Sequence, residues 1–158
     1  MLERKELGMR DVALGRRRVV AWLVGGLALT FGATPFARGK EGASSDVATH
    51  RRWMEAAFDM RRLAESWGDQ SYGAVVVMDG VLIGEGPSRV VKLGDPDAHA
   101  EREAIRDAQS RLGRKSLDGA VLYSTSRPCS RCERIAAEAH IVRMIHGADI
   151  HDAGRPKP

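Results

Sequence analysis

The chain has 158 residues, of which 43% are hydrophobic, and this composition is ordinary for a single globular domain. Its two cysteines exclude a disulfide-rich scaffold, and its apolar runs are shorter than the ~20 residues that a membrane-spanning helix needs. The formal net charge of +4 comes entirely from residues 1–38, because residues 39–158 hold 18 Lys/Arg and 18 Asp/Glu. This balance weakens a nucleic-acid-binding hypothesis, since affinity for phosphates depends on a basic surface.

Residues 1–38 have the pattern of an export signal. Three arginines, Arg16–Arg18, precede an apolar run of 13 residues, Val19–Phe31, whose length fits a signal sequence and is short for a bilayer span. The arginine run resembles a twin-arginine signal. We therefore expect a periplasmic or otherwise exported protein whose mature chain has no stable membrane span. The alternative is a cytoplasmic protein, or one anchored to the membrane by its N-terminus.

Residues 39–48 are polar and contain glycine and serine, which predicts a flexible linker before a folded domain over residues 49–158. Hydrophobic periodicity and turn signals predict the order α-β-β-α-β-α-β. The expected elements are helix 49–67, two strands around Asp79-Gly80 within 73–86, helix 98–112, strand 119–125, helix 129–140 and strand 142–148. Because the last three strands are joined through helices, we expect parallel pairing and a three-layer α/β domain.

The two cysteines, Cys129 and Cys132, stand two residues apart at the start of a predicted helix. Taken alone, this pair permits a disulfide, a redox pair or half of a metal site. His99 begins the preceding helix, and one nitrogen with two sulfurs is the ligand composition of a catalytic zinc site that keeps its fourth position open. Helix N-termini also favour the thiolates that zinc requires.

Glu101 lies two residues after His99, and residues at this spacing do not face each other on a helix. Glu101 is therefore poorly placed to bind the same metal. It is better placed to reach the open coordination position and to handle the proton of a water there.

The motif "HAE" at 99–101, followed by "PCSRC" at 128–132, resembles the H-x-E…P-C-x-x-C signature of zinc-dependent nucleobase deaminases. The resemblance covers roughly residues 50 to 154 and is to the guanine deaminase and tRNA adenosine deaminase branch of the cytidine/deoxycytidylate deaminase-like superfamily. It implies a cytidine deaminase-like α/β/α fold with a mixed central sheet, shortened at its C-terminus relative to other members. A homodimer is expected, because dimers are usual in this branch.

The resemblance implies hydrolytic deamination of a small-molecule nucleobase or nucleoside, with guanine the best single guess. Hydroxide generated at a zinc ion would attack the amino-bearing ring carbon, Glu101 would carry the proton, and ammonia would leave. The implied zinc ligands are His99, Cys129 and Cys132, and the implied substrate contacts are Ser88, Ala100 and Ala74. The alternatives are a tRNA adenosine deaminase-like enzyme, a redox pair, and a non-catalytic, zinc-stabilised binding module.

Three positions depart from the family pattern, and one of them is Ser71, which stands before the first strand where the family usually has proline. Arg127 stands where the family commonly has a glutamate, and Ser88 stands where an asparagine usually contacts the substrate. The chain also ends at "HDAGRPKP", earlier than its relatives, which predicts a more open pocket or one closed by a neighbouring subunit. Arg127 and Arg131 flank the cysteines; solvated surface is the default for both, and an anion contact is the alternative for either.

Overall fold

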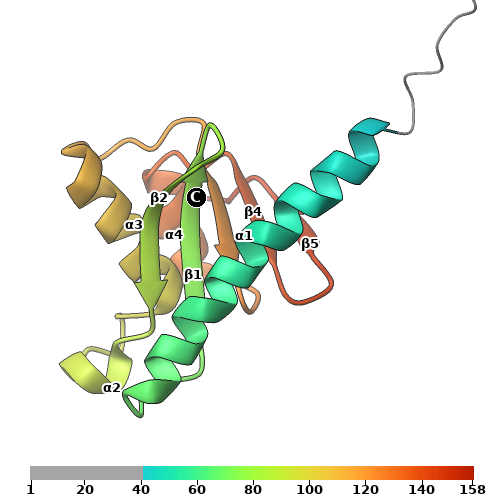
Figure 1. The fold of residues 1–158 in the computed structure, drawn as a ribbon. Coiled ribbons are helices and arrows are strands. Elements are labelled where there is room, and N and C mark those ends of the chain that lie inside the picture. Colours follow the sequence, from blue (N-terminus) through green and yellow to red (C-terminus); the bar gives the residue numbers. More distant parts are fainter. Residues whose placement is uncertain (1–40) are drawn as a thin grey trace, which may run out of the picture. The chain divides into compact units, whose positions relative to one another are not determined.

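The computed structural model describes residues 41–158 (Figure 1), so the export signal predicted for residues 1–38 lies outside the described range. The described elements are α1 (Glu41–Ser66), β1 (Gly73–Met78), β2 (Val81–Pro87), α2 (Val90–Leu93), α3 (Ala100–Leu112), β3 (Val121–Ser124), α4 (Ser130–Glu138), β4 (Arg143–His146) and β5 (His151–Gly154). Every predicted helix and strand is present. The two unpredicted elements, α2 and β5, have four residues each, too few to show a hydrophobic period.

The five strands form one mixed sheet in the order β2-β1-β3-β4-β5. β1 is antiparallel to both β2 and β3, whereas β3 and β4 are parallel. The mixed α/β fold is confirmed, and β3–β4 pair in parallel as expected. The expected parallel pairing of β2 with β3 is not found, because β1 lies between these two strands and is antiparallel to both. A tight turn at Asp79 and Gly80 joins β1 to β2. Both turn residues have positive φ, 51° and 73°, as a two-residue hairpin turn of this kind requires.

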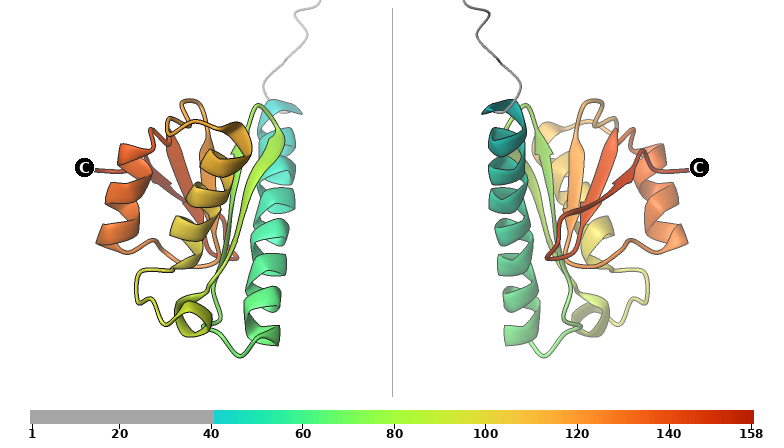
Figure 2. Two further views of the ribbon diagram at one scale, coloured as in Figure 1. Left: turned by 90° about the vertical axis from the view of Figure 1, so that its left-hand side faces the viewer. Right: turned by 90° about the vertical axis from the view of Figure 1, so that its right-hand side faces the viewer.

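Helices cover both faces of the sheet, with α1 on one face and α3 and α4 on the other (Figure 2). Alternate residues along each strand enter two separate cores, as the pleat of a strand dictates. Val75 and Tyr123 face α1 and its buried Trp53. Val76 and Leu122 pack in the core on the side of α3 and α4.

The first helix is longer than expected. α1 begins at Glu41, so residues 41–48 are helical where a flexible linker was predicted. Nothing in this stretch is proline, and once a helix is nucleated each added residue contributes a backbone hydrogen bond. The polar residues 41–48 therefore extend α1 at its N-terminal end. Within residues 41–158, no helix is both long and apolar enough to cross a bilayer.

Helix α3 lies unusually close to β2, because both contact surfaces are made of very small residues. A Cβ atom added to Gly86 would lie 2.1 Å from the carbonyl oxygen of Ala100 and 2.3 Å from the backbone nitrogen of Ala104. A Cβ at Gly84 would lie 2.3 Å from the carbonyl oxygen of Ala104. Real Cβ atoms do not approach backbone this closely, so only glycine permits the contact. This contact fixes the distance of the N-terminal turn of α3 from the sheet.

Gly86→Ala tests this constraint. The added methyl group must push α3 away from the sheet, and we expect the free energy of unfolding to fall by about 1–3 kcal/mol, the usual cost of overpacking. Urea denaturation followed by circular dichroism measures the change. Val81→Ala, on the same strand but 59% exposed, is the control and should change stability by about 0.5 kcal/mol or less. Equal stabilities for Gly86→Ala and the parent chain would contradict the argument.

Candidate active site

Three side chains with metal-binding atoms converge at the N-terminal ends of two helices. His99 is the N-cap residue of α3 and Cys129 is the N-cap residue of α4, while Cys132 lies in the first turn of α4. His99 makes no side-chain capping hydrogen bond, so its ring is available as a ligand. Its Nδ1 atom lies 3.8 Å from Cys129 Sγ and 3.5 Å from Cys132 Sγ. All three ligand atoms lie within 4.8 Å of one another.

This geometry fits a zinc ion. With Zn–N bonds of about 2.0–2.1 Å and Zn–S bonds of about 2.3 Å, tetrahedral angles separate a nitrogen ligand from a sulfur ligand by about 3.6 Å. The two separations between His99 Nδ1 and the sulfurs, 3.5 and 3.8 Å, bracket this value. Both cysteines are free thiols, and three ligands leave the fourth tetrahedral position open. An imidazole nitrogen within reach of both sulfurs favours a metal site over a redox pair, which needs no third group.

Each thiol reaches the thiolate form in a different environment. Cys129 Sγ accepts a hydrogen bond of 3.4 Å from the backbone nitrogen of Cys132, and the helix N-terminus stabilises negative charge there. Cys132 is 2% exposed. Burial, and then the nearby Glu101 carboxylate, raise the pKa of the Cys132 thiol far above its ordinary value. Zinc binding must therefore displace a proton from Cys132, as metal sites of this class do.

Glu101 lies beside this triad without joining it. Among the described residues, the group able to hold a metal consists of His99, Cys129 and Cys132. Glu101 is 5% exposed, and its Oε1 atom accepts a hydrogen bond of 3.2 Å from Ser124 Oγ at the end of β3. One carboxylate oxygen is thus held by the sheet, and the Glu101 side chain lines the adjoining cavity.

A cavity of about 170 Å³ opens beside the triad. Its lining contains residues that the sequence analysis singled out: His99, Ala100, Glu101, Arg127 and Cys129. It also contains three that the sequence analysis did not identify: Gln70, Tyr72 and Ser126. A larger hollow of about 430 Å³ lies between α1, β2 and α3. That hollow contains ion-paired side chains such as Arg111 with Glu85 and no group able to hold a metal, so the smaller cavity is the better candidate for chemistry.

The three predicted substrate contacts are placed differently. Ala100 lines the cavity. Ala74 and Ser88 are fully buried and do not line it. The Ser88 hydroxyl donates a hydrogen bond of 2.9 Å to Asp69 Oδ1, so its polar group is already engaged within the fold. Substrate contact by Ser88 or Ala74 stays a prediction.

Asp69 organises the segment that carries Gln70 to the cavity. Its carboxylate accepts hydrogen bonds from the backbone nitrogens of Gln70 and Lys92, at 2.7 and 2.8 Å, besides the one from Ser88. Burial alone would raise the pKa of Asp69, but these hydrogen bonds outweigh burial and hold that pKa below its usual value. The carboxylate therefore stays charged and keeps the α1–β1 connection attached to α2.

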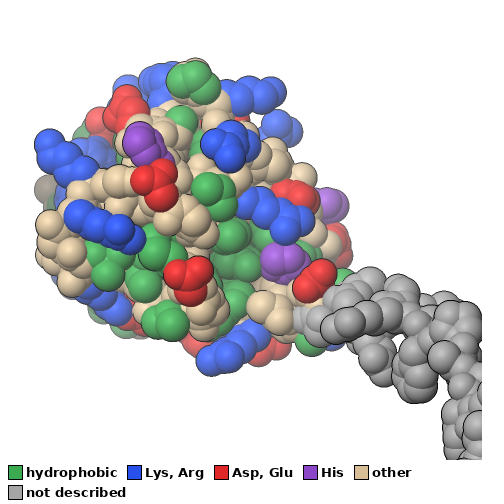
Figure 3. All heavy atoms as spheres, turned by 90° about the horizontal axis from the view of Figure 1, so that it is seen from above, with side chains coloured by type: hydrophobic (Ala, Val, Ile, Leu, Met, Phe, Trp, Pro, Cys, Tyr) green, Lys and Arg blue, Asp and Glu red, His purple; other side chains and the backbone are tan. Residues whose placement is uncertain are grey.

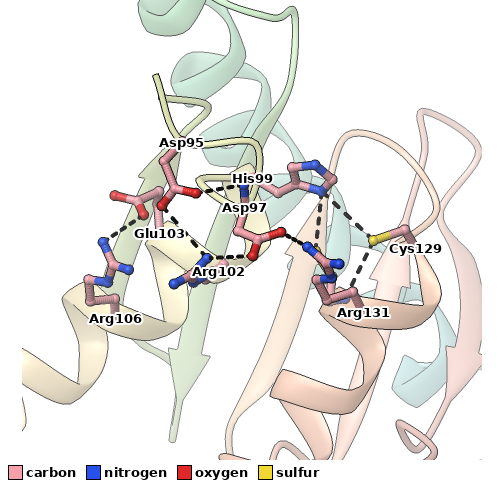
Figure 4. Close-up of polar contacts among 9 residues, drawn as sticks. Asp95, Asp97, His99, Arg102, Glu103, Arg106, Cys129 and Arg131 are labelled. Atoms are coloured by element: carbon pink, nitrogen blue, oxygen red, sulfur yellow. Dashed lines mark hydrogen bonds and ion pairs between the residues drawn. The ribbon is translucent and has the colours of Figure 1, made fainter. Parts of the chain in front are cut away.

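Arg131 and its neighbours bind the two ligand-bearing segments together (Figure 4). Arg131, between the two cysteines, forms an ion pair with Asp97, two residues before His99. Arg102 on α3 lies 3.6 Å from Asp97 and 3.8 Å from Asp95. These ion pairs are partly exposed, so each contributes little energy by itself. Together they connect the loop before His99 to the first turn of α4.

The chain matches the family model of the cytidine and deoxycytidylate deaminase zinc-binding region over residues 47–148, and it belongs to this family of zinc-dependent deaminases. It is 38% identical over 102 residues to the tRNA-specific adenosine deaminase of Agrobacterium fabrum, covering 65% of this chain and 67% of the relative. It is 48% identical over 82 residues to the guanine deaminase of Bacillus subtilis, covering 52% and 53%.

The solved structures agree with this assignment. An X-ray structure of guanine deaminase from Bacillus subtilis matches with a TM-score of 0.60 at 34% identity, over 63% of this chain and 64% of that one. The chain spans about half to two thirds of the length of the curated relatives given above. The expected family and fold are therefore confirmed, while the twin-arginine signal and the homodimer stay predictions.

Cys129→Ala tests the metal site. Loss of one of three ligands should reduce bound zinc from one equivalent towards none, and should lower thermal stability because metal binding is coupled to folding. Metal analysis of the purified chain and a melting curve with and without a chelator measure both effects. Ser130→Ala, in the same helical turn, is the control and should keep its zinc. A Cys129→Ala chain with a full zinc equivalent would rule out this ligand set.

Proposed function

We propose that this chain is a zinc-dependent hydrolytic deaminase that acts on a nucleobase or nucleoside. The observation that carries the proposal is the buried Glu101 carboxylate, held by Ser124 beside the triad of His99, Cys129 and Cys132 at a cavity. His99, Cys129 and Cys132 would hold a zinc ion, which would supply Lewis-acid chemistry and lower the pKa of a bound water. A binding module would need the metal but would not need a buried carboxylate beside it.

The chain's own residues would perform the proton transfers. Glu101 takes a proton from the attacking water and delivers it to the amino group, which leaves as ammonia. Ser124 restrains one carboxylate oxygen, so the second oxygen keeps a fixed direction during both transfers. The backbone N–H of Ala100 has no partner within its own helix because it belongs to the first turn. Ala100 lines the cavity, and its N–H would donate a hydrogen bond to an acceptor on the substrate.

Guanine is the substrate that we propose first, supported by 48% identity to a relative named guanine deaminase. Adenosine in tRNA is the second candidate, supported by 38% identity over 102 residues to a tRNA-specific adenosine deaminase. Residues 39–158 carry equal numbers of basic and acidic side chains. The face seen in Figure 3 intersperses the two signs instead of gathering one basic patch. A protein that binds RNA through its phosphates depends on such a patch, so charge favours the small-molecule substrate.

Glu101→Gln tests the mechanism. Because the amide cannot accept the proton, ammonia release from guanine should fall by at least about 10²–10⁴-fold, the usual contribution of a general acid–base group. Zinc content should stay at one equivalent, since Glu101 is not a ligand. A coupled ammonia assay and metal analysis give the two readouts. Glu138→Gln, an exposed position on α4, serves as the control.

The same assay separates the enzyme from a binding module. A zinc-loaded parent chain that releases no ammonia from a panel of bases, nucleosides and tRNA would refute the enzyme and favour the module. Undiminished turnover by Glu101→Gln would refute the proton transfer.

We further propose that residues 1–38 direct export through a twin-arginine signal, so that the chain is exported after it has folded and bound zinc. The run of three arginines before an apolar stretch supports this. Replacing Arg16, Arg17 and Arg18 together by lysine keeps the charge and should retain the full-length chain in the cytoplasm, as measured by cell fractionation. Arg10→Lys is the control. An unchanged distribution after the triple substitution would exclude this signal.

A further inference from the structure

The two arginines that flank the cysteines have different surroundings, although each follows a serine in the sequence. Arg131 is engaged by Asp97 in the ion-pair network that holds the loop before His99. Arg127 lines the cavity beside the metal triad and is exposed. No carboxylate in the described part of the chain forms an ion pair with it. A guanidinium is always charged at physiological pH, so Arg127 presents an unneutralised positive charge at the cavity.

The two charged side chains that line the cavity differ in sign and in burial. A zinc ion with two thiolates and a neutral imidazole carries no net charge. The remaining charged groups of the lining are Glu101, which is 5% exposed, and Arg127, which is exposed. Gln70, Tyr72 and Ser126 complete this part of the lining without adding charge. A substrate would therefore meet the carboxylate at the buried end of the cavity and the guanidinium at its exposed side.

The charge of Arg127 also affects its surroundings. Burial, then His151 and then Arg127 lower the pKa of His146 at the end of β4. His146 therefore lies within the electrostatic reach of Arg127.

We propose that Arg127 shifts specificity from the unsubstituted base towards an amino-bearing heterocycle that carries an anionic group, phosphate or carboxylate, because Arg127 binds that group. This inference rests on the proposed deaminase function. The planar guanidinium binds either anion through two parallel hydrogen bonds. The cavity of about 170 Å³ is smaller than the ~300–1,000 Å³ typical of pockets that enclose a whole ligand. It therefore takes the ring, with the amino group towards Glu101, and leaves the anionic substituent on the exposed side at Arg127.

Binding measurements in the zinc-loaded Glu101→Gln background test this without turnover. The phosphate arm compares guanosine with guanosine 5′-monophosphate, and the carboxylate arm compares pterin with pterin-6-carboxylate, each by calorimetry. In at least one arm, the anionic ligand should bind about 10- to 100-fold more tightly, the range expected for hydrogen bonds to a charged group. Adding Arg127→Glu should abolish that preference, and adding Arg127→Lys should retain part of it.

A matched charge reversal distinguishes an anion site at Arg127 from a general effect of surface charge. Arg134→Glu, an exposed position on α4, makes the same change of charge away from the cavity and should preserve the preference. Zinc content and melting temperature show whether each variant is folded. No anionic preference in either arm, or a preference that survives Arg127→Glu because the anion binds the metal directly, would overturn the proposal. Failure of the deaminase function would appear separately, as absence of ammonia release by the parent chain.

Discussion

The close contact between α3 and β2 is the constraint on which the site depends. Gly84 and Gly86 allow the backbone of α3 to approach to a distance that any side chain would prevent. Ala100 and Ala104 complete the contact from the helix and are fully buried. Because His99 immediately precedes Ala100, the same contact fixes His99, the first residue of the group able to hold a metal, relative to the sheet. The small residues in this contact are therefore needed to place His99 correctly, as well as to pack the helix.

The strand order then brings the remaining groups to the same edge. β2 and β3 are both antiparallel to β1, so their carboxyl ends point the same way, and the helices that follow them, α3 and α4, begin at one end of the sheet. Ligands bind at the carboxyl ends of strands in open α/β sheets for this reason. β1 starts at that edge, which is why Gln70 and Tyr72, from the preceding loop, line the same cavity.

The sequence was informative where a pattern depends on residue type and short-range spacing. Long helices and the hairpin at Asp79-Gly80 were predictable, because periodicity and turn chemistry are local. Ligand chemistry predicted a group of His99, Cys129 and Cys132, and the structure brings these three side chains together. Gln70 and Tyr72 were not predictable, since only the sheet order places their loop beside the triad. The hydrogen bond that the Ser88 hydroxyl donates to Asp69 was not predictable either, because this partner lies 19 residues earlier and no local pattern indicates it.

Arg127 and Arg131 also show, within one stretch of seven residues, that local sequence does not predict contacts made by the fold. The stretch "SRPCSRC" repeats Ser-Arg before each cysteine, so local sequence offers no reason to treat the two arginines differently. The difference arises from Asp97, which reaches Arg131 because α3 and α4 begin side by side (Figure 4). Arg127 precedes the helix and faces the cavity instead. One arginine therefore ties the loop before His99 to the first turn of α4, and the other leaves its charge available to whatever enters the cavity.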